Sequence, residues 1–396
     1  MTQTRLEPAK RIATFSETVF AKYTRLARQH GAVNLGQGFP DFAPPDFVLE
    51  ALKEAASGYQ QYAPLPGLPD FNEAAALVKG ARLQRELDPV LNVQSTVGAT
   101  EGLFACTQAF VNPGDEVVLL EPFYDAYPAD VLMAGGVPVY VALTPDTSGN
   151  WILDLDELRK AFSDKTKAIF INSPHNPTGK VFSAEELDAI IALAHEFDAL
   201  IISDEVYEYI AFSEQLSPAS RPGGFERTLS ISSIGKTFSV TGWKLGYVVG
   251  PSELIEVVRM AHQWITFVVA SPIQAAAASA LKTASEPGHP YFENLSKTFK
   301  RKHDLLVDAL ENTPFVATRA QGGYFVVADS SALNYQDDVA LCEDLPERVG
   351  VGAIPPSAFY SDEHKHLAKH LVRFAFCKTD DAIVEAARRL KTVEDD

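Results

Sequence analysis

Lys236 is the residue whose sequence surroundings most favour covalent chemistry. It follows a short apolar run, 229–231, and lies in a break of small polar residues that includes Gly235, with a second cation at Lys244. A lysine near another cation holds its proton less tightly, because like charges disfavour the protonated form. A neutral amine is a nucleophile for carbonyl compounds. The alternative interpretation is a pair of surface lysines in a polar loop.

Other polar and aromatic side chains occupy the same kind of position, directly after a buried strand. Asn176, Asp204 and Tyr207 follow such runs, as does Tyr124. In an open parallel sheet with helices on both faces, the carboxyl ends of the strands form a common crevice in which ligands bind. We therefore expect these four residues to converge there with Lys236. Taken singly, each is more simply explained as a cap or turn residue.

A candidate anion site precedes the first of these strands. The stretch 97–102 is small and glycine-containing and opens a predicted helix that runs to Phe110. Exposed amides at a helix start, together with the helix dipole, suit an anion such as phosphate. Helix starts with glycine are common, so this signal is weak alone.

Arg373 is a candidate ligand for an anion. It is flanked by alternating apolar residues in the predicted strand 372–376, so it either escapes to an edge or meets an anion. Gly38 lies in an irregular loop, 33–42, whose backbone amides can face a ligand. A simple turn explains this loop equally well.

The elements that must position these residues alternate between strand and helix over the middle of the chain. This pattern predicts an α/β fold with a mostly parallel sheet flanked by helices. We place a domain boundary near Glu286, with a large domain at 41–285 and a smaller α+β domain built from both termini, 1–40 and 286–396. Helices are predicted at 14–30, 45–57, 70–87, 97–110, 183–197, 253–264, 274–283 and 291–311. The residues 183–186, at the start of one of these helices, fit a capping box. Strands are predicted at 117–121, 137–143, 167–172, 200–203, 229–231, 324–328 and 372–376.

Composition excludes several classes of protein. The net charge of −18 argues against nucleic acid and anionic membranes as main partners, because both require clustered lysine and arginine. The three cysteines are scattered and predict neither a disulfide framework nor a zinc site. We find no signal peptide and no apolar run of the roughly 18 residues that span a membrane. These features predict a soluble cytoplasmic protein.

The motifs, in this order, resemble the fold-type I pyridoxal phosphate enzymes, specifically the class I and II aminotransferases. The likeness is strongest to the kynurenine, glutamine–phenylpyruvate and methionine aminotransferase group. It extends from the stretch 34–42 to the stretch 372–376, and the whole set is specific although no single motif is. It implies the fold-type I architecture and an amino group transfer from an amino acid to a 2-oxo acid.

The resemblance implies roles for the cofactor site. Lys236 corresponds to the lysine that forms a Schiff base with pyridoxal phosphate and later moves a proton between Cα and C4′. Asp204 corresponds to the carboxylate that keeps the pyridine nitrogen protonated. The remaining cofactor residues contact the ring, its 3-oxygen or the phosphate: Ala99, Thr100, Tyr124, Asn176, Tyr207, Ser233, Lys244 and, across a homodimer interface, Tyr62.

The resemblance also implies a substrate site. Arg373 corresponds to the arginine that grips the α-carboxylate, with Gly38 and Asn176 adding contacts. Phe20, Trp264 and Phe267 fall where this group lines its side-chain pocket, in the chain's own site or its neighbour's. An aromatic lining favours aromatic, methionine or glutamine-type donors over acidic ones, because an unpaired buried carboxylate is costly.

Several alternatives stay open. A pyridoxal phosphate β-lyase acting on cysteine S-conjugates shares the same motifs, and an aspartate-type aminotransferase is a further option. A regulatory or binding protein of this fold without turnover is less favoured, since no room for a DNA-binding domain precedes Phe15. A dinucleotide-binding enzyme is disfavoured because no G-x-G-x-x-G motif follows a predicted strand.

Overall fold

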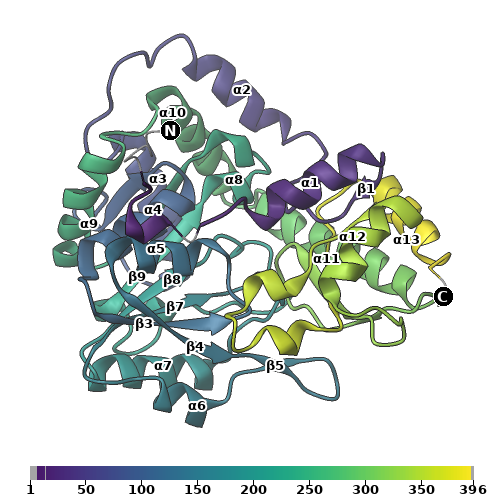
Figure 1. Ribbon diagram of the computed structural model, residues 1–396. Helices are drawn as coiled ribbons and strands as arrows, with labels where there is room; N and C mark the ends of the chain where they lie inside the picture. The colour runs from purple at the N-terminus through teal and green to yellow at the C-terminus, as the bar shows by residue number, and fades with distance from the viewer. Residues whose placement is uncertain (1–6, 14, 394–396) are drawn as a thin grey trace, which may run out of the picture.

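The fold is organised around a seven-stranded sheet with helices on both faces, in a computed structural model that describes residues 7–13 and 15–393 (Figure 1). The strand order is β2-β10-β9-β8-β7-β3-β4. All neighbouring pairs are parallel except the two that β10 makes with β2 and β9. The strands are β2 (Val93–Thr96), β3 (Glu116–Glu121), β4 (Val137–Ala142), β7 (Thr166–Asn172), β8 (Leu200–Asp204), β9 (Thr228–Ser233) and β10 (Gly246–Val249).

The central strands read as continuous apolar runs because both of their faces are buried. In β3, Val118 and Leu120 join one hydrophobic cluster, whereas Val117 and Leu119 join another on the opposite face. This alternation follows from the period of two in a strand. A sheet covered on both faces leaves its strand ends as the natural place for a ligand.

Helices cover both faces of this sheet and pack around it. One of them begins with the capping box predicted from the sequence: Ser183 Oγ accepts from the Glu186 amide at 3.2 Å, and Glu186 Oε2 accepts from the Ser183 amide at 2.9 Å. The helices of this part are α2 (Asp46–Ala55), α3 (Pro69–Leu83), α4 (Gly98–Phe110), α5 (Ala126–Ala134), α6 (Leu155–Lys160), α7 (Ala184–Glu196), α8 (Ile234–Thr237), α9 (Ser252–Ile265) and α10 (Ser271–Ala284).

The C-terminal part contains a three-stranded antiparallel sheet in the order β11-β12-β14. The helix α1 packs against α12, β1 and β13 of the same part (Figure 1). The short strand β1 (Val33–Asn34) pairs in parallel with β13 (Val351–Gly352). The other elements are α1 (Val19–Gln29), α11 (Tyr291–Leu310), β11 (Val316–Ala317), β12 (Phe325–Asp329), α12 (Asp338–Arg348), β14 (Leu371–Ala375) and α13 (Asp380–Leu390), with a small hairpin of β5 (Thr144–Pro145) and β6 (Trp151–Ile152). We propose on this basis a small domain of 1–40 with 286–396 and a large domain of 41–285.

Some sequence expectations differ from the structure. The helix expected at 14–30 begins only at Val19, and Thr14 lies outside the described residues. The helix expected at 70–87 ends at Leu83, because Gln84 adopts a left-handed conformation with φ of 51°. Strands β2 and β10 and helices α5, α6, α12 and α13 were not predicted.

Among the described residues, none of the helices combines the length and the apolar character that crossing a membrane requires.

Candidate active site

A cavity of about 240 Å³ opens at the carboxyl ends of β7, β8 and β9, and it gathers most of the candidate residues. It is also lined by the start of α4 and by one residue of β14. The candidates that line it are Phe20, Gly38, Ala99, Thr100, Tyr124, Asn176, Asp204, Tyr207, Ser233, Lys236, Lys244 and Arg373. The sequence argument that strand ends converge therefore describes the geometry of this cavity.

Lys236 lies in a one-turn helix and not in the irregular break expected from the sequence. Ser233 caps this helix, and its hydroxyl accepts from the Lys236 amide at 3.4 Å. The Lys236 amine donates to the Gly38 carbonyl at 3.0 Å and lies 4.9 Å from the centre of the Tyr324 ring. The short helix thereby holds the amine inside the cavity.

The amine of Lys236 has a lowered affinity for protons. Burial is the largest cause and brings its pKa to about 8, while the positive charges of Lys244 and Arg373 act in the same direction. Asp204 opposes this shift but does not cancel it. The sequence argument named Lys244 as the cause, whereas the structure gives the larger part to burial. A substantial fraction of the amine is therefore neutral near pH 8.

Asp204 stands at the end of β8 with its carboxylate held on both oxygens. Tyr127 donates from its hydroxyl to Oδ2 at 2.7 Å, and the Val206 amide donates to Oδ1 at 3.2 Å. Burial raises the pKa of Asp204 to about 6, against the hydrogen bond from Tyr127 and the charge of Lys236. The carboxylate is mostly ionised at neutral pH and can pair with a cationic ring nitrogen.

Tyr127 was missed in the sequence. It lies on α5, three residues after Tyr124, and the two rings meet edge to face at 5.6 Å. An aromatic pair at i and i+3 just after a strand end was the available signal. Asn172 was missed as well, although it ends β7: its Oδ1 accepts from the Asn176 amide at 2.6 Å and its side-chain amide donates to the Asp204 carbonyl at 2.8 Å.

The start of α4 forms a cradle for an anion. Gly98 adopts φ of +72°, and a Cβ at this position would lie 3.1 Å from the Lys244 amine. Ala99 and Thr100, the next residues of the first turn, line the cavity together with Ser233. Helix dipole, amides, hydroxyl and amine suit a phosphate group at this end of the cavity.

Arg373 is fully buried on β14 and lines the same cavity. Its two terminal nitrogens donate to Asn176 Oδ1 at 3.1 Å and to the Gly36 carbonyl at 2.8 Å. The guanidinium lies 4.0 Å from the centre of the Phe325 ring, and no described residue accepts from its Nε. Burial lowers its pKa to about 10, so it stays cationic at neutral pH. A fixed cation with a free donor is suited to a carboxylate.

Gly38 is required by close approach. A Cβ there would lie 2.4 Å from the tip of Phe325, which supports Arg373. The sequence argument expected the Gly38 amide to face a ligand, whereas its carbonyl accepts from Lys236. Phe20 contributes an aromatic wall, 5.2 Å from the Arg373 guanidinium.

Three candidate residues do not reach the cavity of their own chain. Tyr62, Trp264 and Phe267 have exposed fractions of 81%, 86% and 55%. Tyr62 and Phe267 meet edge to face with ring centroids 5.3 Å apart. Large exposed aromatic side chains that gather on one surface are typical of an interaction site.

The described residues contain no group of histidine, cysteine and acidic side chains that could hold a metal ion.

Comparison with known proteins identifies the class. The family described as aminotransferase class I and II matches residues 30–390. The chain belongs to this family, and it is an aminotransferase whose family uses pyridoxal phosphate as cofactor.

Individual relatives carry several names. The chain is 39% identical to the kynurenine–oxoglutarate transaminase of Dictyostelium discoideum, over 96% of this chain and 95% of that protein. The structure of N-succinyldiaminopimelate aminotransferase from Mycobacterium tuberculosis is 43% identical and superposes with a TM-score of 0.92, covering 97% of this chain and 99% of that one. The structure of YbdL from Escherichia coli, described with a methionine aminotransferase function, is 35% identical with a TM-score of 0.92, covering 98% and 100%. The names share the reaction class and differ in substrate.

The donor set of the cavity fits pyridoxal phosphate. The anion cradle at α4 suits its phosphate, and the buried carboxylate of Asp204 suits its ring nitrogen. The amine of Lys236 opens into the same cavity and suits its aldehyde. Tyr124 supplies an aromatic face for the ring in that cavity.

Proposed function

We propose that this aminotransferase moves the α-amino group of an aromatic, methionine or glutamine-type amino acid to a 2-oxo acid in a ping-pong cycle. The observation that carries the choice of substrate is the lining of the cavity. Arg373 is the only arginine among its lining residues, and Phe20 and Phe325 stand beside it. One arginine serves the α-carboxylate, which leaves no arginine for an acidic side chain.

When bound, pyridoxal phosphate supplies an aldehyde for the amino group and a ring that accepts the electrons released when Cα loses its proton. Asp204 keeps the ring nitrogen protonated, and Tyr127 keeps Asp204 ionised and oriented. The first turn of α4, with Ser233 and Lys244, holds the phosphate. Each group acts from a fixed position, which is the main way in which such sites lower a barrier.

Arg373 orients the substrate by its α-carboxylate, assisted by Asn176. In the loaded site Lys236 would take the proton from the substrate Cα and carry it during the transfer, which requires its neutral amine. A pKa of about 8 places this amine near the range in which a general base works efficiently at neutral pH. The second half-reaction uses the same residues in reverse with a 2-oxo acid.

A panel of donors tests the substrate class. We expect kynurenine, phenylalanine, methionine or glutamine to exceed aspartate and N-succinyldiaminopimelate by about 100-fold or more in kcat/KM, because an unpaired acidic group must be desolvated. A preference for either acidic donor would contradict the proposal. Pyruvate and ammonia release from a cysteine S-conjugate, without any oxo acid, would instead indicate a β-lyase. Lys236→Ala serves as the inactive control.

We also propose a homodimer in which Tyr62 reaches the phosphate of the neighbouring site. Its exposed position beside Phe267 supports this proposal. Mixing Lys236→Ala subunits with Tyr62→Ala subunits tests it, because a mixed dimer regains one site with both residues intact. We expect activity above that of either variant alone, and its absence in a dimer that does exchange subunits would contradict the shared site. The cytoplasmic location stays a prediction.

A further inference from the structure

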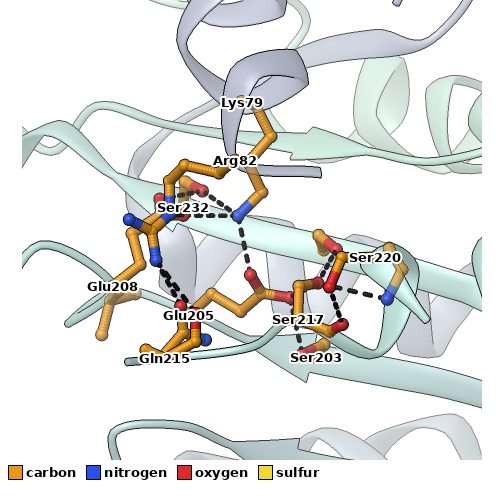
Figure 2. Close-up of polar contacts among 12 residues, drawn as sticks. Lys79, Arg82, Ser203, Glu205, Glu208, Gln215, Ser217, Ser220 and Ser232 are labelled. Carbon is orange, nitrogen blue, oxygen red and sulfur yellow. Dashed lines mark hydrogen bonds and ion pairs between the residues drawn. The ribbon is translucent and has the colours of Figure 1, made fainter. Parts of the chain in front are cut away.

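A buried ion network connects α3 with residues at the carboxyl ends of β8 and β9, next to Asp204 and Ser233 in sequence (Figure 2). Figure 2 shows Lys79 reaching from α3 toward Glu205 and Glu208. Its amine donates to Glu205 Oε2 at 2.8 Å, to Glu208 Oε2 at 2.6 Å and to Ser232 Oγ at 3.2 Å. The exposed fractions of these three charged side chains are 0%, 1% and 1%.

The network is balanced in charge and rich in hydrogen bonds. Arg82, one turn after Lys79 on α3, pairs with Glu208 at 3.2 Å, so two cations meet two carboxylates. The other carboxylate oxygens accept from hydroxyls: Glu208 Oε1 from Ser232 at 2.6 Å, and Glu205 Oε1 from Ser203 at 2.9 Å and Ser217 at 2.6 Å. A fully satisfied polar network fixes the relative positions of its members.

The members of this network alternate along the chain with active-site residues. Asp204 lines the cavity and Glu205 enters the network, and Tyr207 and Glu208 repeat this pattern one turn later. On β9, Ser232 enters the network and the next residue, Ser233, lines the cavity and caps the helix of Lys236. The same turn thus presents one face to the ligand and the other to Lys79.

The network extends to a third active-site segment. Arg82 also donates to the side-chain oxygen of Gln215. The side-chain amide of Gln215 donates in turn to the Ser173 carbonyl at 3.2 Å, in the loop that leads to Asn176. The loop after β7 and the ends of β8 and β9 are therefore tied to one helix, α3.

We propose that Lys79 is a positioning residue of the active site, which holds Asp204 and Tyr207 in register with Ser233 and Lys236 through Glu205, Glu208 and Ser232. This inference rests on the proposed roles of Asp204 and Lys236. Lys79 does not line the cavity and touches neither cofactor nor substrate. It acts by fixing the turn 204–208 against the end of β9.

The chemistry of the network argues for this role over a purely stabilising one. Buried ion pairs often add little net stability compared with apolar packing of similar volume, since both charges must be desolvated. They do impose specific geometry, because each carboxylate oxygen has a defined donor. Although burial lowers the pKa of Lys79, the charges of Glu205 and Glu208 outweigh it and the net shift is upward. Lys79 therefore stays cationic.

Three variants test the role in the cofactor-loaded enzyme. Lys79→Met removes the charge at similar length. Lys79→Met with Glu205→Gln restores the charge balance, leaving Arg82 opposite Glu208. Ser232→Ala removes one hydroxyl and leaves the charges in place. Lys302→Met is the matched control, because Lys302 is also buried and bonded, to the Lys378 carbonyl at 2.6 Å and to Asp380 at 2.8 Å. Unlike the partners of Lys79, neither of these residues is next in sequence to a residue that lines the cavity.

The readouts are the pH midpoint of the visible absorbance of bound cofactor, the rate of cofactor loss on ultrafiltration, kcat and KM. In the Lys79 variants we expect the midpoint to move by about 0.5 pH unit or more. We expect kcat to fall by about 100-fold, the scale set by a displacement near 1 Å, with KM changing less. Ser232→Ala should change the pH midpoint and kcat in the same directions, but by less. If the Lys79 variants do not fold, Ser232→Ala decides the question.

The role is overturned if the variants match Lys302→Met in thermal stability while their midpoint, cofactor loss and kcat equal those of the wild type. If only Ser232→Ala can be measured, wild-type values of its midpoint, cofactor loss and kcat overturn the role as well. Failure of the proposed function gives a different result, because Lys236→Ala would then retain full turnover. An inactive Lys236→Ala enzyme with unaffected Lys79 variants overturns the positioning role only.

Discussion

The hydroxyl of Tyr127 donates a hydrogen bond of 2.7 Å to Asp204 Oδ2, and this contact joins α5 to the end of β8 beneath the cavity. Burial raises the pKa of Asp204 to about 6, and the bond from Tyr127 works against that shift. The phenol therefore helps to keep the carboxylate charged in surroundings that favour the neutral acid.

Tyr127→Phe removes this donor without changing the ring. Hydrogen bonds to charged groups contribute about 1.5–3 kcal/mol, so we expect pyridoxal phosphate to bind about 10- to 100-fold more weakly. Fluorescence titration of the cofactor-free protein measures this affinity. Tyr140→Phe is the control, since Tyr140 packs on Phe123 at 5.7 Å and does not line the cavity. Equal affinities for the two variants would refute the role of Tyr127.

Asp204→Asn should change the pH dependence of stability in the cofactor-free protein. The folded-state pKa of Asp204 is about 6, above its ordinary value of 3.8, so the folded protein binds more protons than the unfolded chain between these values. The contribution of Asp204 to stability is therefore fully present below about pH 4 and is lost as the pH rises through 6. The loss is about 3 kcal/mol. Asparagine does not titrate, so the free energy of unfolding of the variant should rise relative to that of the wild type from pH 4 to pH 7.

Urea unfolding of both proteins at several pH values between 4 and 7 measures this difference. A stability difference that stays constant across this range would show that the Asp204 carboxyl is not titrating in the way the buried site implies.

The rate at which the cofactor-free protein takes up pyridoxal phosphate covalently should follow the neutral form of Lys236. Its pKa of about 8 predicts a rate that rises with pH and levels off above that value. Lys244→Met removes a neighbouring positive charge and should move the midpoint upward. Stopped-flow absorbance at saturating cofactor provides the measurement, and a wild-type midpoint near the ordinary lysine value of about 10.4 would exclude a perturbed amine.

Arg373→Lys should impair the binding of the amino acid more than the chemical step. The lysine amine cannot reproduce the planar set of donors that meets Asn176, Gly36 and a carboxylate. We expect KM to rise by about 100-fold, the equivalent of one hydrogen bond to a charged group. Arg28→Lys on the exposed side of α1 is the control. An amine that lacks the α-carboxylate should react equally with Arg373→Lys and with the control. An unchanged KM of Arg373→Lys for the amino acid would refute the role of Arg373 in binding the α-carboxylate.

The sequence predicted the convergence of the site because strand ends are visible as apolar runs followed by polar residues. Asn176, Asp204 and Lys236 each follow such a run, and all three line one cavity. The capping box at Ser183 was predicted for a similar reason, since its two hydrogen bonds are local in sequence. Features that depend on residues close together in the sequence were therefore the ones that could be predicted.

Features that depend on contacts between residues far apart in the sequence could not be predicted. Strand β10 is short and its antiparallel place between β2 and β9 is set by pairing across the sheet. Lys79 looks like an ordinary helical lysine, and only the fold brings it to Glu205, 126 residues away. The exposed positions of Tyr62 and Trp264 depend in the same way on how their segments pack.

Arg373 is the last lining residue of the cavity to be translated, because it lies on β14. The groups suited to the cofactor, from Ala99 to Lys244, emerge from the ribosome well before it. Under the proposed roles, a nascent chain acquires the residues for the ring and the phosphate first, and the arginine for the α-carboxylate only when β14 has been made. Amino acids would then be bound only once synthesis of the chain is nearly complete.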